Sequence, residues 1–102
     1  MKTSLTDGSS RWFDPDKAEK FDENTYFDGH NMISRATGDQ WLHEALYKTA
    51  TDKFILNHWS QWQGSRESYE EITPKEAAAW LVQNKHDPAK AGLDAETAEL
   101  EV

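Results

Sequence analysis

Two runs in the middle of the chain combine large apolar side chains with interspersed polar ones. They are "QWLHEALYKTA" at 40–50 and "KFILNHWSQWQG" at 53–64, and both are rich in the aromatic and branched residues that favour strands. Thr51 and Asp52 stand between the two runs. We therefore expect them to pair as an antiparallel hairpin around this turn.

The register of this hairpin decides which side chains share a face of the sheet. If Thr51 and Asp52 alone form the turn, Tyr47 pairs with Leu56. One face then collects Trp41, His43, Tyr47, His58 and Trp62. A three-residue loop shifts the pairing by one residue and exchanges the faces of one strand relative to the other. The turn residues leave both registers open, but in either register Trp59 and Trp62 point to opposite faces.

Turn signals divide the flanking sequence into further short strands. Asp28-Gly29 is typical of tight hairpin turns and lies between Tyr26-Phe27 and Met32-Ile33. "TGDQ" at 37–40 is expected to form the next turn, and "RESYEEI" at 66–72 an edge strand. Nearer the start, we expect a short strand at "RWF" (11–13) after a loosely ordered segment at 1–10.

Two segments carry the start signals of helices. In "ITPKEAAAWLVQNK", Thr73 is the expected N-cap, Pro74 takes the first helical position and Glu76 completes a capping box. The stripe that would pack on a sheet consists of Ala77, Trp80 and Leu81. In "DPDKAEKF" at 14–21, Asp14 and Pro15 favour a short N-terminal helix of two or three turns.

The last part of the sequence is polar and acidic. Residues 86–102 contain five acidic side chains and one lysine, and few apolar residues that could pack. The predicted fold class is therefore α+β, with an antiparallel β-meander of three to five strands. A C-terminal helix packs on one face of the meander, and a short N-terminal helix precedes it. We expect one domain over 1–86 and a disordered acidic tail over 87–102.

Composition narrows the classes of function. Hydrophobic residues make up only 36% of the chain, but 12% are aromatic and five are tryptophan, which indicates a folded protein with a small core. The absence of cysteine excludes disulfides, thiolate metal sites and cysteine nucleophiles. A formal net charge of -8 disfavours direct nucleic-acid binding. No apolar run reaches the length of a signal peptide or membrane span, so a cytoplasmic location without membrane contact is expected.

No catalytic or metal-binding pattern stands out in the sequence. The "HEALY" segment lacks the second histidine of a zinc-protease motif, and no phosphate-binding loop or nucleophile elbow occurs. We therefore expect no enzyme activity, no cofactor and no metal. The candidate residues for a protein interface or ligand site are Trp41, His43, Tyr47, His58, Trp59 and Trp62. The candidates for an acidic face are Asp14, Asp16, Glu19, Asp22, Glu23 and Asp28.

These candidates favour a small binding or regulatory domain that acts through protein–protein contacts with a partner protein or as a homodimer. A first alternative is a small-ligand pocket on the sheet, lined by Trp41, His43, His58 and Trp62. A second is an acidic inhibitor, a nucleic-acid mimic or an antitoxin-like protein whose tail becomes ordered on binding.

Overall fold

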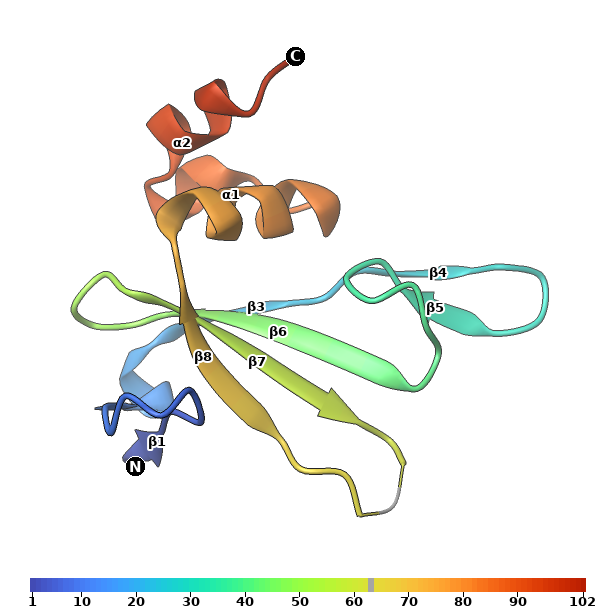
Figure 1. Cartoon of the computed structure of the whole chain (residues 1–102). Coiled ribbons are helices and arrows are strands. Elements are labelled where there is room, and N and C mark those ends of the chain that lie inside the picture. Colours follow the sequence, from blue (N-terminus) through green and yellow to red (C-terminus); the bar gives the residue numbers. More distant parts are fainter. Residues whose placement is uncertain (63) are drawn as a thin grey trace.

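The computed structural model describes residues 1–62 and 64–102 and has an α+β architecture (Figure 1). Its main sheet has four antiparallel strands in the order β3-β6-β7-β8. These strands are β3 (Glu19–Asp22), β6 (Leu42–Lys48), β7 (Phe54–Ser60) and β8 (Ser68–Ile72). Neighbours in the sheet follow one another along the chain, except that a small hairpin is inserted between β3 and β6. The predicted meander is therefore confirmed.

Two further pairs of strands flank the main sheet. The hairpin of β4 (Thr25–Phe27) and β5 (Met32–Ser34) turns at Asp28-Gly29 as predicted, with Phe27 opposite Met32. The pair of β1 (Thr3–Ser4) and β2 (Trp12–Phe13) lies on the side of the sheet opposite the C-terminal helices (Figure 1). The helical elements are η1 (Pro15–Lys17), α1 (Pro74–Gln83), η2 (Pro88–Ala91) and α2 (Asp94–Glu99). Among the described residues, no helix is long and apolar enough to cross a membrane.

The β6–β7 hairpin adopts the register with a three-residue loop. Leu46 pairs with Leu56 and Tyr47 with Ile55. The N–H of Thr49 donates to the carbonyl oxygen of Lys53 (2.8 Å), which closes the loop around Asp52 in the left-handed conformation (φ 63°). An aspartate tolerates this conformation better than most residues, which favours this loop over a two-residue turn. Leu46 and Leu56 consequently face α1, while Tyr47 and Ile55 face the opposite side.

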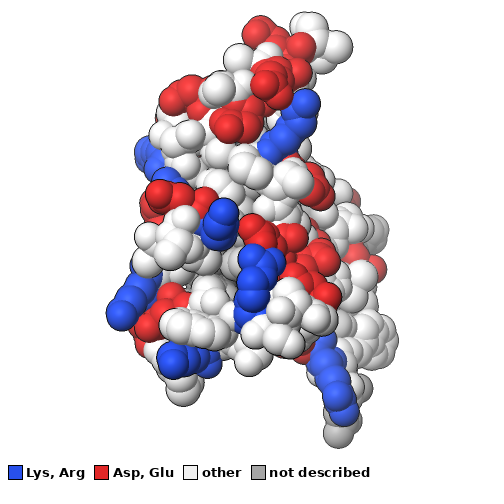
Figure 2. All heavy atoms as spheres, turned by 60° about the vertical axis from the view of Figure 1, so that its left-hand side comes forward, with Lys and Arg blue, Asp and Glu red and all other residues white. Residues whose placement is uncertain are grey.

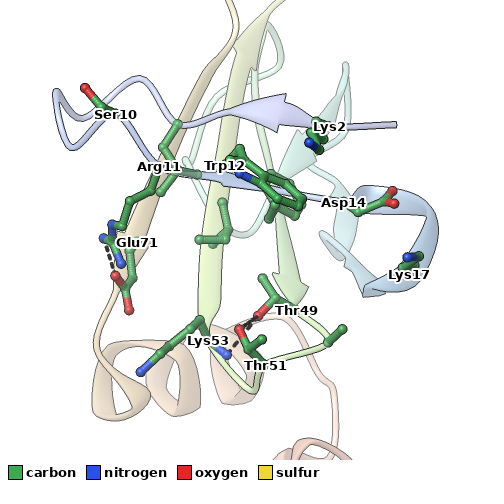
Figure 3. A pocket seen from close by; sticks show the side chains of 14 residues that line it. Lys2, Ser10, Arg11, Trp12, Asp14, Lys17, Thr49, Thr51, Lys53 and Glu71 are labelled. Carbon is green, nitrogen blue, oxygen red and sulfur yellow. Dashed lines mark hydrogen bonds and ion pairs between the residues drawn. The ribbon is translucent and has the colours of Figure 1, made fainter.

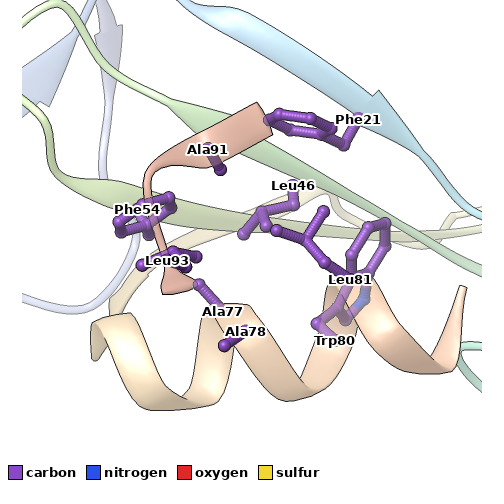
Figure 4. Packing of buried hydrophobic residues seen from close by; sticks show 9 residues of the cluster. All are labelled: Phe21, Leu46, Phe54, Ala77, Ala78, Trp80, Leu81, Ala91 and Leu93. Atoms are coloured by element: carbon purple, nitrogen blue, oxygen red, sulfur yellow. The ribbon is translucent and has the colours of Figure 1, made fainter. Parts of the chain in front are cut away.

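The face under α1 holds the main core (Figure 4). Leu46, Phe54 and Phe21 of the sheet pack against the predicted stripe of α1, formed by Ala77, Trp80 and Leu81. Thr73 and Glu76 cap α1 reciprocally, as expected: the N–H of Glu76 donates to Oγ1 of Thr73 and the N–H of Thr73 to Oε1 of Glu76 (both 3.1 Å). The capping box therefore starts α1 one turn before Ala77, the first residue of the apolar stripe.

The opposite face carries a second, smaller core built by the N-terminal segment. Leu5, Phe13 and Ile55 are its buried members, and Tyr47 and Tyr69 pack against them. The segment also covers the outer edge of β8, since the N–H of Thr6 donates to the carbonyl oxygen of Tyr69 (2.7 Å). Residues 1–10, expected to be loosely ordered, are therefore held by β1, by Leu5 and by this edge contact.

The predicted N-terminal helix is wrong beyond its first turn. Asp14 is the N-cap, as expected, and its side chain accepts the N–H of Asp16 (3.0 Å). The helical segment ends at Lys17, however, and the chain continues as β3, where Phe21 pairs with Leu46. Pairing with β6 buries Phe21 on the face under α1, which a short isolated helix could not achieve.

The structure also does not confirm a disordered tail over 87–102. Ala91 and Leu93 belong to the main core (Figure 4), and Leu93 is 3% exposed. Asp87 caps η2 by accepting the N–H of Ala89 (3.0 Å), and Gly92 takes a left-handed conformation (φ 74°) that ends η2. The low average content of apolar residues in this segment predicted disorder. Two of its apolar side chains, Ala91 and Leu93, nevertheless pack in the main core and hold the segment against it.

Candidate functional site

Two tryptophans, Trp41 and Trp62, form an exposed aromatic pair at one end of the main sheet. Their ring centroids are 5.4 Å apart and their planes are tilted by 48°. Trp41 precedes β6 and Trp62 follows β7, so neither takes part in the strand ladder. The N–H of Gln61 donates to the carbonyl oxygen of Trp41 (2.9 Å) and joins the two strand ends. We call this pair the tryptophan clamp.

The backbone of the tryptophan clamp is held by neighbouring side chains. The N–H of Trp41 donates to Oδ1 of Asp39 (2.6 Å), and the N–H of Trp62 donates to Oγ of Ser60 (3.1 Å). Trp41 is nevertheless 41% exposed and Trp62 61% exposed, while Trp80 in the core is 6% exposed. The tryptophan clamp therefore presents a large apolar surface to solvent from an ordered backbone.

The β4–β5 hairpin lies at the same end of the molecule (Figure 1) and carries two exposed apolar side chains. The cross-strand pair of Phe27 and Met32 is 65% and 55% exposed. The turn is fixed by Asp28, whose Oδ1 accepts the N–H groups of His30 and Asn31 (both 2.8 Å). Hydrogen bonds from Asn31 and then His30 favour the charged carboxylate and lower the pKa of Asp28 below its usual value.

The predicted residues His43 and Trp59 meet on the face opposite α1. Their rings stack with centroids 5.7 Å apart, and Nδ1 of His43 lies 3.1 Å from Oε2 of Glu23. Oε1 of Glu23 also accepts the N–H of Glu44 (2.8 Å). Nε2 of His43 is buried and makes no hydrogen bond within the described residues. These contacts tie the chain after β3 to β6.

His58 lies on the other face of the sheet and does not meet His43. Its Nδ1 is 3.4 Å from Oε2 of Glu44, and Oε1 of Glu44 accepts the indole N–H of Trp80 (3.0 Å). The observed hairpin register thus separates the two histidines, and the pocket expected from Trp41, His43, His58 and Trp62 is not assembled. Tyr47 packs against Phe13, with ring centroids 5.2 Å apart, and belongs to the second core.

The acidic candidates do not line one helix face, because most of their segment is not helical. Asp14 and Asp16 belong to the η1 turn, and Glu23 is turned inward toward His43. The others lie on β3 (Glu19 and Asp22) and in the β4–β5 turn (Asp28). The structure therefore spreads these carboxylates over η1, β3, the segment after β3 and the β4–β5 turn, and leaves Glu23 only partly exposed.

A pocket on the face opposite α1 was missed by reasoning from the sequence (Figure 3). It has a volume of about 640 Å³ and lies where β2, η1 and the β6–β7 loop come together. Trp12, Lys17 and Lys53 line it, from segments that are far apart in the chain. The sequence places Lys53 directly after the expected turn at Thr51 and Asp52. It does not indicate that β2 and η1 lie beside this turn.

No group of three histidine, cysteine or acidic side chains that could hold a metal ion occurs in the described part of the chain. Comparisons of the chain with family models, curated proteins and solved structures found no match.

Proposed function

We propose that the protein is a small, non-enzymatic binding domain of the cytoplasm that contacts a partner protein through the tryptophan clamp. The exposure of both tryptophans from a hydrogen-bonded backbone is the observation that supports this function. Tryptophan is enriched among the residues that dominate binding energy at interfaces, and it loses little conformational entropy when it is already held in place. Phe27 and Met32 are further exposed apolar side chains, on the β4–β5 hairpin at the same end of the molecule.

The edges of the main sheet favour this surface over strand-to-strand association. At one edge, Tyr69 in β8 makes two backbone hydrogen bonds to Thr6. Its N–H donates to Oγ1 of Thr6 (2.7 Å), and its carbonyl oxygen accepts the N–H of Thr6. The other edge strand, β3, is four residues long and three of them are charged. Short, charged or covered edges oppose the addition of a further strand. Binding through the side chains of the tryptophan clamp does not require a free strand edge.

The net charge indicates the kind of partner. At a formal net charge of -8, two copies of the chain repel each other, whereas a partner with a basic surface around an apolar site is attracted. We therefore propose a basic protein partner, and a homodimer is the competing outcome of the test.

The test compares the double variant Trp41→Ala/Trp62→Ala with the wild-type protein and with Trp12→Ala. Trp12 is a matched control, because it is a tryptophan of similar exposure (55%) on a different part of the molecule. Proteins retained from a lysate of the encoding organism at low and moderate salt are identified by mass spectrometry. The most specific one is then purified, and its dissociation constant is measured for each variant.

The expected result is a basic protein whose dissociation constant rises at least about tenfold in the double variant and stays unchanged in Trp12→Ala. Higher salt should weaken its binding to the wild-type protein. Light scattering over a concentration series distinguishes the homodimer, which would show a mass increase that the double variant loses. Retention of the same proteins by all three variants, without any such mass increase, would exclude the tryptophan clamp as the interface.

A further inference from the structure

The pocket of about 640 Å³ opposite α1 combines an apolar floor with a polar rim (Figure 3). Its floor is the buried second core, formed by Leu5, Phe13 and Ile55. The indole of Trp12 stands over the floor as an exposed wall. Hydroxyl groups of Thr49 and Thr51 in the β6–β7 loop, 3.2 Å apart, contribute hydrogen-bonding groups to the rim.

The charge of the rim is opposite to that of the whole protein. Four of the eleven basic side chains line the pocket, against two of the nineteen acidic ones, a formal balance of +2 in a chain of -8. The basic members are Lys2, Arg11, Lys17 and Lys53, and the acidic ones are Asp14 and Glu71. In Figure 2, where this end of the molecule comes forward, acidic side chains crowd the C-terminal helical end at the top, and the lower part carries basic side chains with acidic ones among them. The pocket is therefore a local basic site on an acidic protein.

Most of these cations are not neutralised by the protein itself. Arg11 is paired with Glu71, but Lys2, Lys17 and Lys53 make no ion pair with any described residue. The ammonium group of Lys2 lies 4.7 Å from the ring centroid of Trp12, where the ring face attracts it without cancelling its charge. Three ammonium groups thus remain to interact with a ligand.

We infer that this pocket binds a small organic carboxylate with an apolar body, such as an arylalkanoate. The volume falls in the range of about 300–1,000 Å³ that is usual for small-molecule sites. The apolar body would lie against Trp12 and the floor of Phe13 and Ile55, where burial of apolar surface favours binding. The carboxylate would be held at the rim by the ammonium group of Lys17 or of Lys53, which Figure 3 shows on opposite sides of the pocket, since hydrogen bonds between charged groups are the strong ones.

The same features disfavour a polyanion as the occupant. A nucleic acid needs a continuous track of basic groups, whereas the rim cations surround one hollow and the rest of the chain is strongly acidic. A single carboxylate needs only one or two of the ammonium groups. The site differs from the tryptophan clamp in every residue, so it can fail or succeed independently of the proposed protein interface.

The test uses 4-phenylbutyrate as the probe and its neutral amide as the matched ligand. Binding to the wild-type protein is followed by calorimetry and by the backbone and indole N–H signals in nuclear magnetic resonance spectra. We expect saturable binding of the carboxylate, with shifts at Thr49–Lys53 and at the Trp12 indole, and binding of the amide at least about tenfold weaker.

Charge variants distinguish the pocket from a general attraction to cations. Lys17→Gln/Lys53→Gln should raise the dissociation constant of the probe about tenfold, because the ammonium groups on both sides of the pocket that could hold the carboxylate are lost. Lys85→Gln/Lys90→Gln makes the same change of charge at two exposed lysines that do not line the pocket, and should leave binding unchanged. Absence of saturable binding, equal binding of the amide, or shifts centred on Trp41 and Trp62 would each refute the site.

Discussion

Glu44 joins β6 to three other parts of the fold through its carboxylate and its backbone N–H. It accepts the indole N–H of Trp80 from α1 and faces His58 on β7, while its own backbone N–H donates to Glu23. Trp80 is almost fully buried, so its indole N–H has no water to replace a lost partner. Glu44 therefore adds a directional contact to the apolar packing that holds α1 on the sheet.

Glu44→Ala is expected to lower the free energy of unfolding by about 1–3 kcal/mol, the cost of leaving a buried donor without an acceptor. Glu44→Gln retains an amide oxygen for the indole N–H and should lose clearly less. Urea unfolding followed by circular dichroism measures both variants. Equal losses in the two variants would show that the charge near His58, and not the bond to Trp80, is what matters.

Tyr69 gives the protein a specific response to alkaline pH. Burial, and then the nearby Glu67 and Tyr47, raise the pKa of its phenol to about 12 from 10.0. Because the folded state retains the proton to higher pH than the unfolded state, this contribution to stability is complete below pH 10 and is lost between pH 10 and about 12. Ultraviolet titration should show one of the three tyrosines ionising late. Tyr69→Phe should remove that late step; if it removes an ordinary one, the assignment is wrong.

At the scale of elements, the C-terminal segment contributes to the core through one leucine. Leu93→Ala is expected to lower the free energy of unfolding by about 2–5 kcal/mol, as for other buried leucines. Leu100→Ala is the matched control, since Leu100 is 40% exposed, and should change it by less than about 0.5 kcal/mol. Chemical denaturation compares the two. Similar small effects would indicate that the segment does not stay packed in solution.

Elements that depend on neighbouring residues were predictable from the sequence, and those that depend on distant ones were not. The capping box of Thr73 and Glu76 and the turn at Asp28-Gly29 are local, and the structure confirms both. The segment after Asp14 has the start signal of a helix, but pairing of Phe21 with Leu46 makes it a strand. For the same reason the burial of Leu93 could not be inferred, because its contacts come from β7 and α1.

The candidate site shows the same limit. The exposed pair of Trp41 and Trp62 follows from their places at the two ends of one hairpin, which the sequence indicates. The separation of His43 from His58 follows from the length of the β6–β7 loop, and the sequence left this length open. The pocket rim could not be foreseen, because Lys17 and Lys53 line one pocket only after β2, η1 and the β6–β7 loop have come together on the same face.

At the scale of the whole molecule, the excess of acidic residues should make stability depend on salt. Raising the salt concentration from about 0.01 to about 0.15 M shortens the screening length from about 30 to about 8 Å, and weakens repulsion across the acidic surface. The midpoint of thermal unfolding is therefore expected to rise over this range. Differential scanning calorimetry measures it.

A charge-reduced variant provides the control for this salt effect. Glu70→Gln/Glu101→Gln lowers the formal net charge from -8 to -6 at two exposed positions that make no ion pair among the described residues. Its midpoint should rise less with salt than that of the wild-type protein. A midpoint that falls with salt in both proteins would mean that favourable ion pairs outweigh the net repulsion.

The position of Leu93 also has a consequence for the protein while it is being made. The ribosome completes the four strands of the main sheet and α1 before it adds residues 91–93, so the growing chain at that stage lacks Ala91 and Leu93 of the main core. Until this segment emerges from the exit tunnel, Phe21 and Phe54 lack part of their cover. The nascent chain should therefore bind chaperones and resist compaction until that point, and then fold in one late step.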